Sequence, residues 1–184
     1  MQQTREKILH TASKLFYQRG FQAVGIDMIV AESGVAKMTL YRHFASKDDL
    51  IAAYLERSNQ QFWVWLDAAV AHVAAPKARL VAIFEAVGRV AISPECLGCT
   101  FQGAAAEFPA LDHPGHQVAL AHKQQVRRRL KDLAEQAGLR DSAALANQLL
   151  MLMDGAWVGA RMFGSANPAT DLSAAARSLI QAHE

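Results

Sequence analysis

The chain has 184 residues, of which just over half are apolar and a fifth are charged, and its formal net charge is +2. This balance indicates a folded protein with a sizeable core and excludes global disorder. No segment approaches the ~20 uninterrupted apolar residues of a membrane span, and the first residues lack the apolar core of a signal peptide. We therefore expect a cytoplasmic protein with no membrane partner.

The charge is distributed unevenly along the chain. Residues 1–47 carry seven basic and three acidic side chains, a net charge of +4, whereas the remainder carries 12 basic and 14 acidic side chains, a net charge of −2. A basic N-terminal quarter on a slightly acidic body favours binding of a polyanion at that end of the molecule.

The first predicted helix follows Thr4 and ends at Gly20. Apolar residues at helical spacing form one stripe along it: Ile8, Leu9, Ala12, Leu15 and Phe16. Thr4 provides half of a capping box, and Gly20 is a typical residue after a helix C-terminus. One amphipathic helix is therefore expected here.

Two short helices separated by a glycine turn come next. The periodicity predicts helices at about residues 26–33 and 37–44, with Gly34 between them in the left-handed conformation. On the second of these helices, Leu40 and Phe44 fall on the same face and are expected to point inward. Helix, glycine turn and helix together predict a helix-turn-helix.

The rest of the chain also shows only helical periodicity. Ser46 is a suitable N-cap for a long helix that runs toward Val73, with acidic residues in its first turn. Further helices are predicted at about residues 77–92, 99–108, 116–137, 142–163 and 172–184. The expected fold is all-α, with a three-helix head joined by the long fourth helix to a helical body.

The second helix of the helix-turn-helix carries an unusual density of polar and cationic side chains. Its outward or rim positions, with one residue of the following helix, are Lys37, Met38, Thr39, Tyr41, Arg42, His43 and Lys47. Such side chains can neutralise phosphates, bond to guanine or contact the thymine methyl group. The alternative interpretation is the surface of an ordinary three-helix subdomain.

The segment from Gly34 to Lys47 closely resembles the head of the TetR family of bacterial transcriptional regulators, and the first helix matches that head as well. The resemblance implies an all-α homodimer that binds double-stranded DNA at a near-palindromic operator, with the seven residues above contacting DNA. It also implies a DNA-binding domain of residues 1–47 and a ligand-binding and dimerisation domain of residues 48–184. Val24 and Gly25 stand where the family usually has Thr or Ser, and Met38 stands where it often has Gly.

The last two predicted helices are candidates for a homodimer interface. Gly155 and Gly159 are spaced i, i+4 on an apolar helix rich in methionine, and Ala174–Ala176 are small residues on the final helix. Such residues allow helices to approach closely, and two helices from each subunit would form a four-helix interface as the resemblance implies. The alternative is an internal core helix with no role in assembly.

A pocket for an unidentified small-molecule effector is expected in the body. Candidate wall residues are Phe62, Trp65, Phe84, Phe101, Phe108, Met153 and Trp157. Gln102, Glu107 and Asp154 are candidate polar anchors for the effector, or else solvated or capping residues. Aromatic residues at helical spacing are equally consistent with a plain core.

Cys96 and Cys99 leave three alternatives open. They could form a zinc site together with His113, His116 and His122. They could instead sense oxidants as a free thiol pair, or pack as ordinary apolar residues. A basic run over residues 123–131 is interpreted as a solvated helix face.

The sequence contains no glycine-rich phosphate loop, nucleophile elbow or zinc-protease motif, so an enzyme is not expected. No cofactor and no resident metal are predicted. The expected function is a DNA-binding transcriptional regulator, specifically a repressor that a small-molecule ligand releases from its operator. The alternative is a redox- or metal-responsive regulator that uses Cys96 and Cys99.

Overall fold

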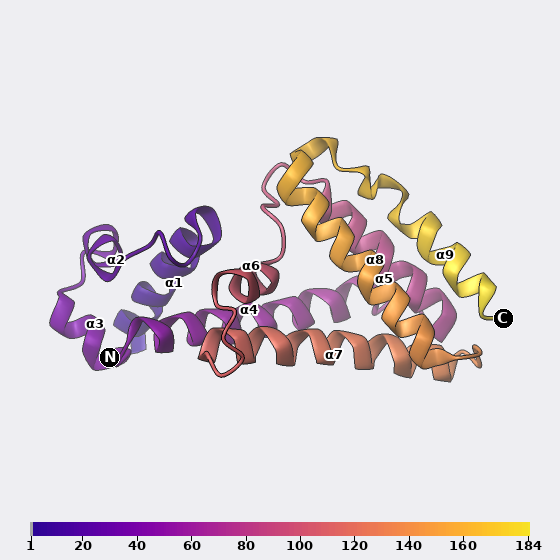
Figure 1. Cartoon of the computed structure of the whole chain (residues 1–184), viewed down its shortest axis with the longest axis horizontal. Helices are drawn as coiled ribbons and strands as arrows, with labels where there is room; N and C mark the ends of the chain where they lie inside the picture. Colours follow the sequence, from indigo (N-terminus) through magenta and orange to yellow (C-terminus); the bar gives the residue numbers. More distant parts are fainter. Residues whose placement is uncertain (1) are drawn as a thin grey trace. The chain divides into compact units, whose positions relative to one another are not determined.

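The structure, a computed structural model, describes residues 2–184, and within them it contains nine α-helices, two short 3-10 helices and no strand (Figure 1). The helices are α1 (Gln2–Arg19), α2 (Ile26–Ser33), α3 (Lys37–His43), α4 (Lys47–Val70), α5 (Pro76–Ala91), α6 (Thr100–Glu107), α7 (Pro114–Gln136), α8 (Ser142–Phe163) and α9 (Leu172–Ala182). The 3-10 helices η1 (Gly164–Ala166) and η2 (Pro168–Asp171) lie between α8 and α9. The predicted all-α fold is confirmed.

Helix boundaries follow the local signals of the sequence, with one correction. Ser46 caps α4 as predicted, because its hydroxyl accepts a hydrogen bond from the Asp49 N–H at 3.0 Å and donates to the Asp49 carboxylate at 2.8 Å. Pro76 and Pro114 begin α5 and α7, where the missing N–H of proline costs no helical hydrogen bond. The capping role predicted for Thr4 is wrong, since α1 already begins at Gln2.

The chain divides into two compact units. The first contains residues 2–60 and 100–122, so that α1, α2, α3 and α6 share it with the first parts of α4 and α7. The second contains residues 61–99 and 123–184, which include α5, α8, α9 and the remaining parts of α4 and α7. These units follow spatial contacts, whereas the functional division at residues 47 and 48 stays a prediction.

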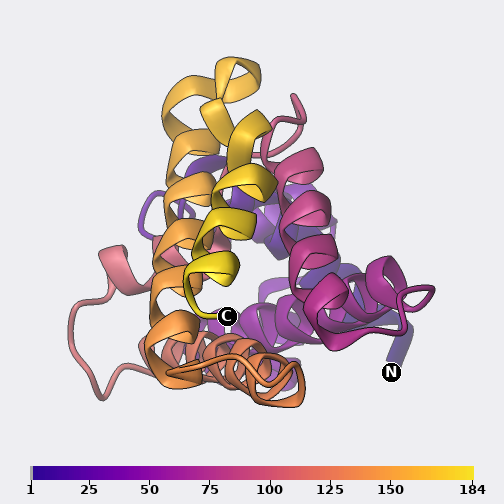
Figure 2. The ribbon, with the colours of Figure 1, turned by 90° about the vertical axis from the view of Figure 1, so that its right-hand side faces the viewer.

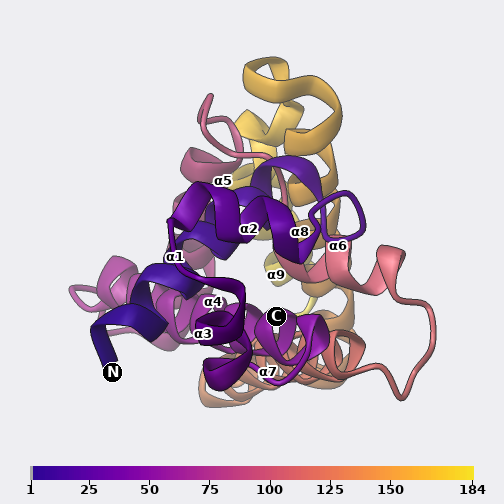
Figure 3. The same ribbon diagram turned by 90° about the vertical axis from the view of Figure 1, so that its left-hand side faces the viewer.

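In the first unit, α1, α2 and α3 pack against one another (Figure 3). The predicted stripe of α1 is buried, and Phe16 from this stripe contacts the rings of Phe21 and Tyr54 at centroid distances of 5.3 and 5.8 Å. Phe108 joins the same cluster through an edge contact with Phe21 at 5.6 Å. These aromatic contacts connect the three-helix head to α4 and to the end of α6.

In the second unit, α5, α8 and α9 lie side by side and enclose the larger apolar core (Figure 2). Asn167 is a polar side chain inside this core, where it is 3% exposed. Its amide nitrogen donates to the carbonyl oxygens of Ala91 and Ala156 at 3.0 and 2.9 Å, and its oxygen accepts from the Ala169 N–H at 3.2 Å. One buried amide thus joins the end of α5 and the C-terminal half of α8 to η2.

Candidate nucleic-acid interface

Helix α3 separates an apolar inner side from a polar outer side. Leu40 is fully buried and Phe44, directly after the helix, is 3% exposed, whereas Met38 is 74% exposed and Tyr41 is 40% exposed. Gly34 ends α2 in the left-handed conformation, with φ at 64°, and its N–H donates to the Val30 carbonyl. The predicted orientation of α3 is confirmed, and its outer side is free to meet a partner.

The seven residues predicted to contact DNA lie on or beside this outer side. Lys37, Met38, Tyr41 and Arg42 are exposed, and Thr39, His43 and Lys47 are half-buried. The Arg42 guanidinium donates to the Thr39 hydroxyl at 3.4 Å, a geometry that keeps both groups on one surface. The arrangement presents two kinds of cation, two hydroxyls and a flexible apolar side chain within two helical turns.

An acidic side chain that the sequence analysis did not single out lies next to this surface. The Asp27 carboxylate, in the first turn of α2, accepts a hydrogen bond from the Lys37 ammonium group at 2.7 Å. This hydrogen bond and the charge of Asp27 raise the pKa of Lys37 above its ordinary value, so the side chain is cationic at neutral pH. Asp27 therefore partly neutralises one cation of the surface.

The start of α2 has no side-chain cap. Gly25 occupies the N-cap position in an extended conformation, and no side chain accepts from the first turn. Because Gly25 has no side-chain oxygen, the first N–H groups of α2 are not covered by a hydroxyl. They are available to an anionic partner, as the N-terminal amides of a helix can be.

The residues predicted to line an effector pocket are mostly packed. Phe84, Phe101, Phe108, Met153 and Trp157 are buried, while Phe62 and Trp65 are half-buried with their ring centroids 5.7 Å apart. Phe101 stacks on His122 and Phe108 stacks on His113, at centroid distances of 3.7 and 4.0 Å. Their role in ligand binding stays a prediction.

The candidate polar anchors make contacts within the protein. Glu107 accepts two backbone hydrogen bonds from the turn between α1 and α2, and Asp154 pairs with Lys123. Lys123 belongs to the basic run of α7, in which Arg129 and Lys131 also have acidic partners, Asp67 and Glu135. Three of the five cations of this run, Lys123, Arg129 and Lys131, therefore have an acidic partner.

The zinc alternative finds no support in the part of the chain that the structure describes. Among residues 2–184, no three His, Cys, Asp or Glu side chains are grouped so that they could hold a metal ion. Cys96 is a buried free thiol and Cys99 a partly exposed one, and His116 and His122 bond to Phe108 and Asn59. The described residues thus do not bring Cys and His side chains together as the zinc alternative requires.

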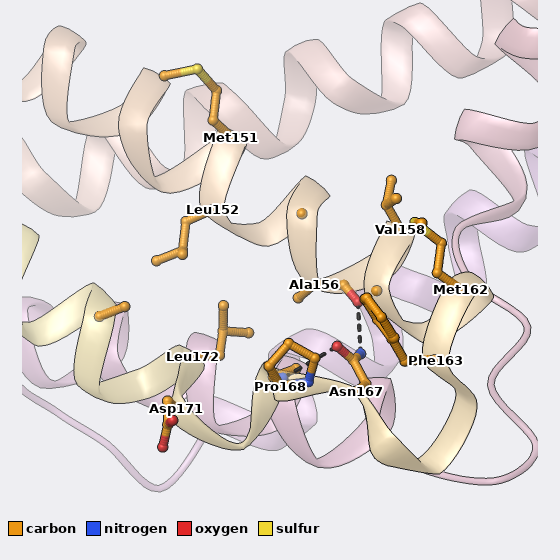
Figure 4. A pocket seen from close by; sticks show the side chains of 14 residues that line it. Met151, Leu152, Ala156, Val158, Met162, Phe163, Asn167, Pro168, Asp171 and Leu172 are labelled. Carbon is orange, nitrogen blue, oxygen red and sulfur yellow. Dashed lines mark hydrogen bonds between the residues drawn. The ribbon is translucent and has the colours of Figure 1, made fainter.

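Helix α8 has an apolar outer side that continues into a groove of about 420 Å³ toward η2 and α9 (Figure 4). Met151, Val158, Met162 and Phe163 are exposed by 66, 45, 70 and 54%, respectively. Exposed apolar surface of this extent is typical of an interaction site. None of the residues predicted to bind the effector borders the groove.

The two predicted interface glycines on α8 differ in their surroundings. Gly155 is exposed, and a Cβ atom added there would meet nothing within 4 Å. Gly159 is buried, and a Cβ atom there would collide with the side chain of Asn167 in the same chain. The expectation that Gly159 allows a partner helix to approach is corrected: its lack of a side chain makes room for Asn167.

A short helix, a left-handed glycine turn and a second short helix with a basic outer side define a helix-turn-helix DNA-binding protein. None of the helices formed by residues 2–184 combines the length and apolar character that crossing a lipid bilayer requires. Residues 8–54 match the model of the family described as "Bacterial regulatory proteins, tetR family".

Solved structures extend this similarity over the whole chain. A TetR-family transcriptional regulator from Streptomyces coelicolor is 33% identical, with a TM-score of 0.93, over 100% of this chain and 97% of that one. A TetR transcriptional regulator from Streptomyces avermitilis is 29% identical, with a TM-score of 0.89, over 98% and 97% of the two chains. The chain belongs to the TetR family, and it is a DNA-binding transcriptional regulator rather than an enzyme.

Two curated relatives match over a short segment of the chain. The transcriptional activator FasR of Mycolicibacterium smegmatis is 45% identical over 53 residues, which are 29% of this chain and 24% of FasR. The regulator YxaF of Bacillus subtilis is 49% identical over 49 residues, which are 27% of this chain and 26% of YxaF. The aligned segment therefore spans about a quarter of each of these relatives.

Proposed function

We propose that the protein is a homodimeric repressor that binds a near-palindromic operator through α3 and leaves it when a small molecule binds the body. In this proposal residues 1–47 form the DNA-binding domain, and residues 48–184 form the ligand-binding and dimerisation domain. The observation that supports it most directly is the two-sided character of α3. Lys37, Tyr41 and Arg42 are exposed on its outer side, and Leu40 is buried on its inner side.

The chemistry of the outer residues suits the major groove. Arg42 can form two hydrogen bonds with guanine, and the Met38 side chain can contact a thymine methyl group. Lys37, Thr39, Tyr41, His43 and Lys47 supply donors for phosphates or base edges, and Lys47 does so at the start of α4, where backbone amides also favour anions. Positioning by phosphates and reading of bases would thus come from the same short segment.

The proposed dimer uses the apolar side of α8 together with α9. The exposed methionines, Val158 and Phe163 border an open groove, and exposed Gly155 allows a partner helix to lie close to the α8 backbone. Burial of such a surface is favourable at about 25 cal/mol for each Å² of apolar area. Two copies related by a two-fold axis would present two α3 helices to half-sites about one helical turn, ~34 Å, apart.

The dimer is proposed to have two conformations that differ in the distance between its α3 helices. An effector releases DNA only if it binds these two conformations with different affinity. The second unit holds all three tryptophans of the chain, Trp63, Trp65 and Trp157. Their fluorescence should therefore report binding of an effector in the body. A screen of small apolar and aromatic compounds against this signal gives candidates, which are then tested for release of DNA.

Selection of bound duplexes from random DNA tests the proposal. We expect a two-fold-symmetric consensus, and we expect Tyr41→Ala with Arg42→Ala to lower affinity for it on the order of 100-fold, since each lost base contact costs about 1–3 kcal/mol. Transcription in vitro from a promoter that overlaps the consensus should fall when the protein is added. Unchanged binding by the double variant would refute the role of α3, and increased transcription would refute repression.

A further inference from the structure

Glu107 is the last residue of α6, a position where a negative charge is unfavourable. The C-terminal end of a helix carries a partial negative charge from its unpaired carbonyl groups, so a carboxylate there needs compensation from elsewhere. The side chain is half-buried, and no cation pairs with it among the salt bridges of residues 2–184. Its compensation comes from the backbone of the DNA-binding head.

Each oxygen of this carboxylate accepts one backbone hydrogen bond. Oε1 accepts from the Phe21 N–H at 3.0 Å, and Oε2 accepts from the Gln22 N–H at 2.6 Å. Both donors follow the end of α1, whose last N–H bond runs from Gly20 to the Phe16 carbonyl. Charge-assisted bonds of this kind are stronger than bonds between neutral groups, and two parallel bonds also fix orientation.

The turn is shaped to receive the carboxylate. Gly20 has a φ of 84°, a backbone angle that residues other than glycine rarely adopt. A Cβ atom added there would lie 2.8 Å from Oε1 of Glu107. The adjacent Phe21 ring contacts Phe108, the residue that follows α6, at a centroid distance of 5.6 Å. Two hydrogen bonds to the carboxylate and an aromatic contact therefore join the same turn to the same end of α6.

The opposite end of α6 is joined to α4. The Tyr54 hydroxyl and the Thr100 hydroxyl, at the first residue of α6, are 2.8 Å apart and share a hydrogen bond. Tyr54 also contacts the Phe21 ring at 5.9 Å. Helix α6 thus connects α4 at one end with the turn that leads into α2 at the other, all within the first compact unit.

We propose that Glu107 is a positioning residue for operator binding: its carboxylate holds the turn before α2, and thereby holds α2 and α3 in place on α6. Glu107 itself touches no DNA in this proposal. The inference rests on the proposed reading of DNA by α3. Loss of the two hydrogen bonds leaves the outer side of α3 intact but allows the whole head to shift relative to α6.

The test is the affinity of Glu107→Gln for the duplex recovered by selection from random DNA. Glutamine has the same shape but offers one acceptor oxygen, and its NH₂ group opposes the second backbone N–H. We expect about tenfold weaker binding of a duplex with two half-sites, less than twofold change for a single half-site, and faster hydrogen exchange at the Phe21 and Gln22 amides. The salt dependence should not change, because no cation is lost.

The sign of this effect separates positioning from simple electrostatics. Removal of a negative charge from a DNA-binding protein should by itself strengthen DNA binding, whereas the proposal predicts weaker binding. Asp112→Asn, at an exposed residue of the loop after α6, removes the same charge and should bind both duplexes at least as well as the native protein. Glu107→Asp retains the charge but shortens the side chain, and it should weaken binding of the two-half-site duplex like Glu107→Gln.

Native-like or tighter binding of the two-half-site duplex by both Glu107 variants would overturn the proposal. Weaker binding without faster exchange at Phe21 and Gln22 would overturn it as well, since the turn would then not have been released. The DNA affinity of each variant is measured at the same number of degrees below its own melting temperature, so that differences in global stability do not affect the comparison. Arg42→Ala on the same duplex tests the role of α3 separately. If this variant binds as tightly as the native protein, the proposed role of α3 is wrong, but hydrogen exchange at Phe21 and Gln22 still tests the Glu107 contacts.

Discussion

Helices α3 and α8 each expose a methionine to a similar extent, yet their surroundings point to different partners. Met38 is 74% exposed on α3 and lies one helical turn from the cation Arg42, whereas Met162 is 70% exposed on α8 beside Phe163. A flexible apolar side chain among cations suits a groove lined by phosphates, and the same side chain among apolar neighbours suits another apolar helix. The neighbours, rather than the exposed residue, therefore indicate the class of partner.

The largest effect is expected where a charge is placed on the apolar side of α8. Met162→Glu should produce a monomer at micromolar concentration, because a buried carboxylate without a partner is strongly unfavourable in an interface. Affinity for the two-half-site duplex should fall by more than about 100-fold, since the second half-site is no longer bound by a linked subunit. Sedimentation and DNA titration measure the two effects.

Ala144→Glu is the matched control for this variant. It introduces the same charge on an exposed residue of α8, in the first turn, where an acid is favourable and outside the groove. This control should remain dimeric and bind DNA normally. A dimeric Met162→Glu protein would show that the subunits associate through another surface.

The inner side of α8 can be tested through Asn167. Asn167→Ala removes three hydrogen bonds inside the core and leaves the carbonyls of Ala91 and Ala156 without this donor. We expect the free energy of unfolding to fall by about 2–4 kcal/mol and the melting temperature by roughly 5–10 °C. Calorimetry measures both quantities, and the exposed Asn147→Ala should change the free energy by less than about 0.5 kcal/mol.

Much of the fold follows from local sequence signals. Along residues 2–184, helices appear where apolar residues recur at helical spacing. Gly34 ends a helix and Ser46 begins one, as their chemistry predicts. The inward and outward sides of α3 were predictable for the same reason, because Leu40 and Phe44 are one turn apart. Periodicity and capping depend on neighbours along the chain, and these are visible in the sequence.

Contacts between distant residues could not be predicted in this way. In the sequence Asn167 only lies between two predicted helices, but in the structure its side chain donates to the carbonyl of Ala91, 76 residues earlier in the chain. The partners of Glu107 lie 85 and 86 residues away from it. One signal was nevertheless present: a carboxylate at the end of α6 opposes the helix dipole, and such a local conflict indicates a tertiary partner.

On the α3 side, Lys47→Ala should weaken binding to all duplexes alike. Lys47 is the first residue of α4 and is expected to contact a phosphate, which carries no sequence information. Affinity should fall about fivefold for specific and non-specific DNA, and the slope of log K against log salt should decrease by about one. Titrations at four salt concentrations measure the slope. Lys131→Ala in α7, a cation paired with Glu135, should leave the slope unchanged, and a sequence-dependent loss in Lys47→Ala would instead indicate base contact.

The smallest expected effect has the opposite sign and concerns Asp27. Because the Asp27 carboxylate binds the Lys37 ammonium group at 2.7 Å, Lys37 must give up this partner or share it when a phosphate approaches. Asp27→Asn should therefore strengthen binding about two- to fivefold and raise the salt slope by about one, with little change in stability, since exposed ion pairs contribute ~0–1 kcal/mol. The gain should be greater for non-specific DNA, so that the ratio of specific to non-specific affinity falls. Glu32→Gln, an exposed acid on the same helix, should change binding less. Weaker binding by Asp27→Asn would mean that Asp27 orients Lys37 for contact with DNA, and the acid would then contribute to affinity rather than restrain it.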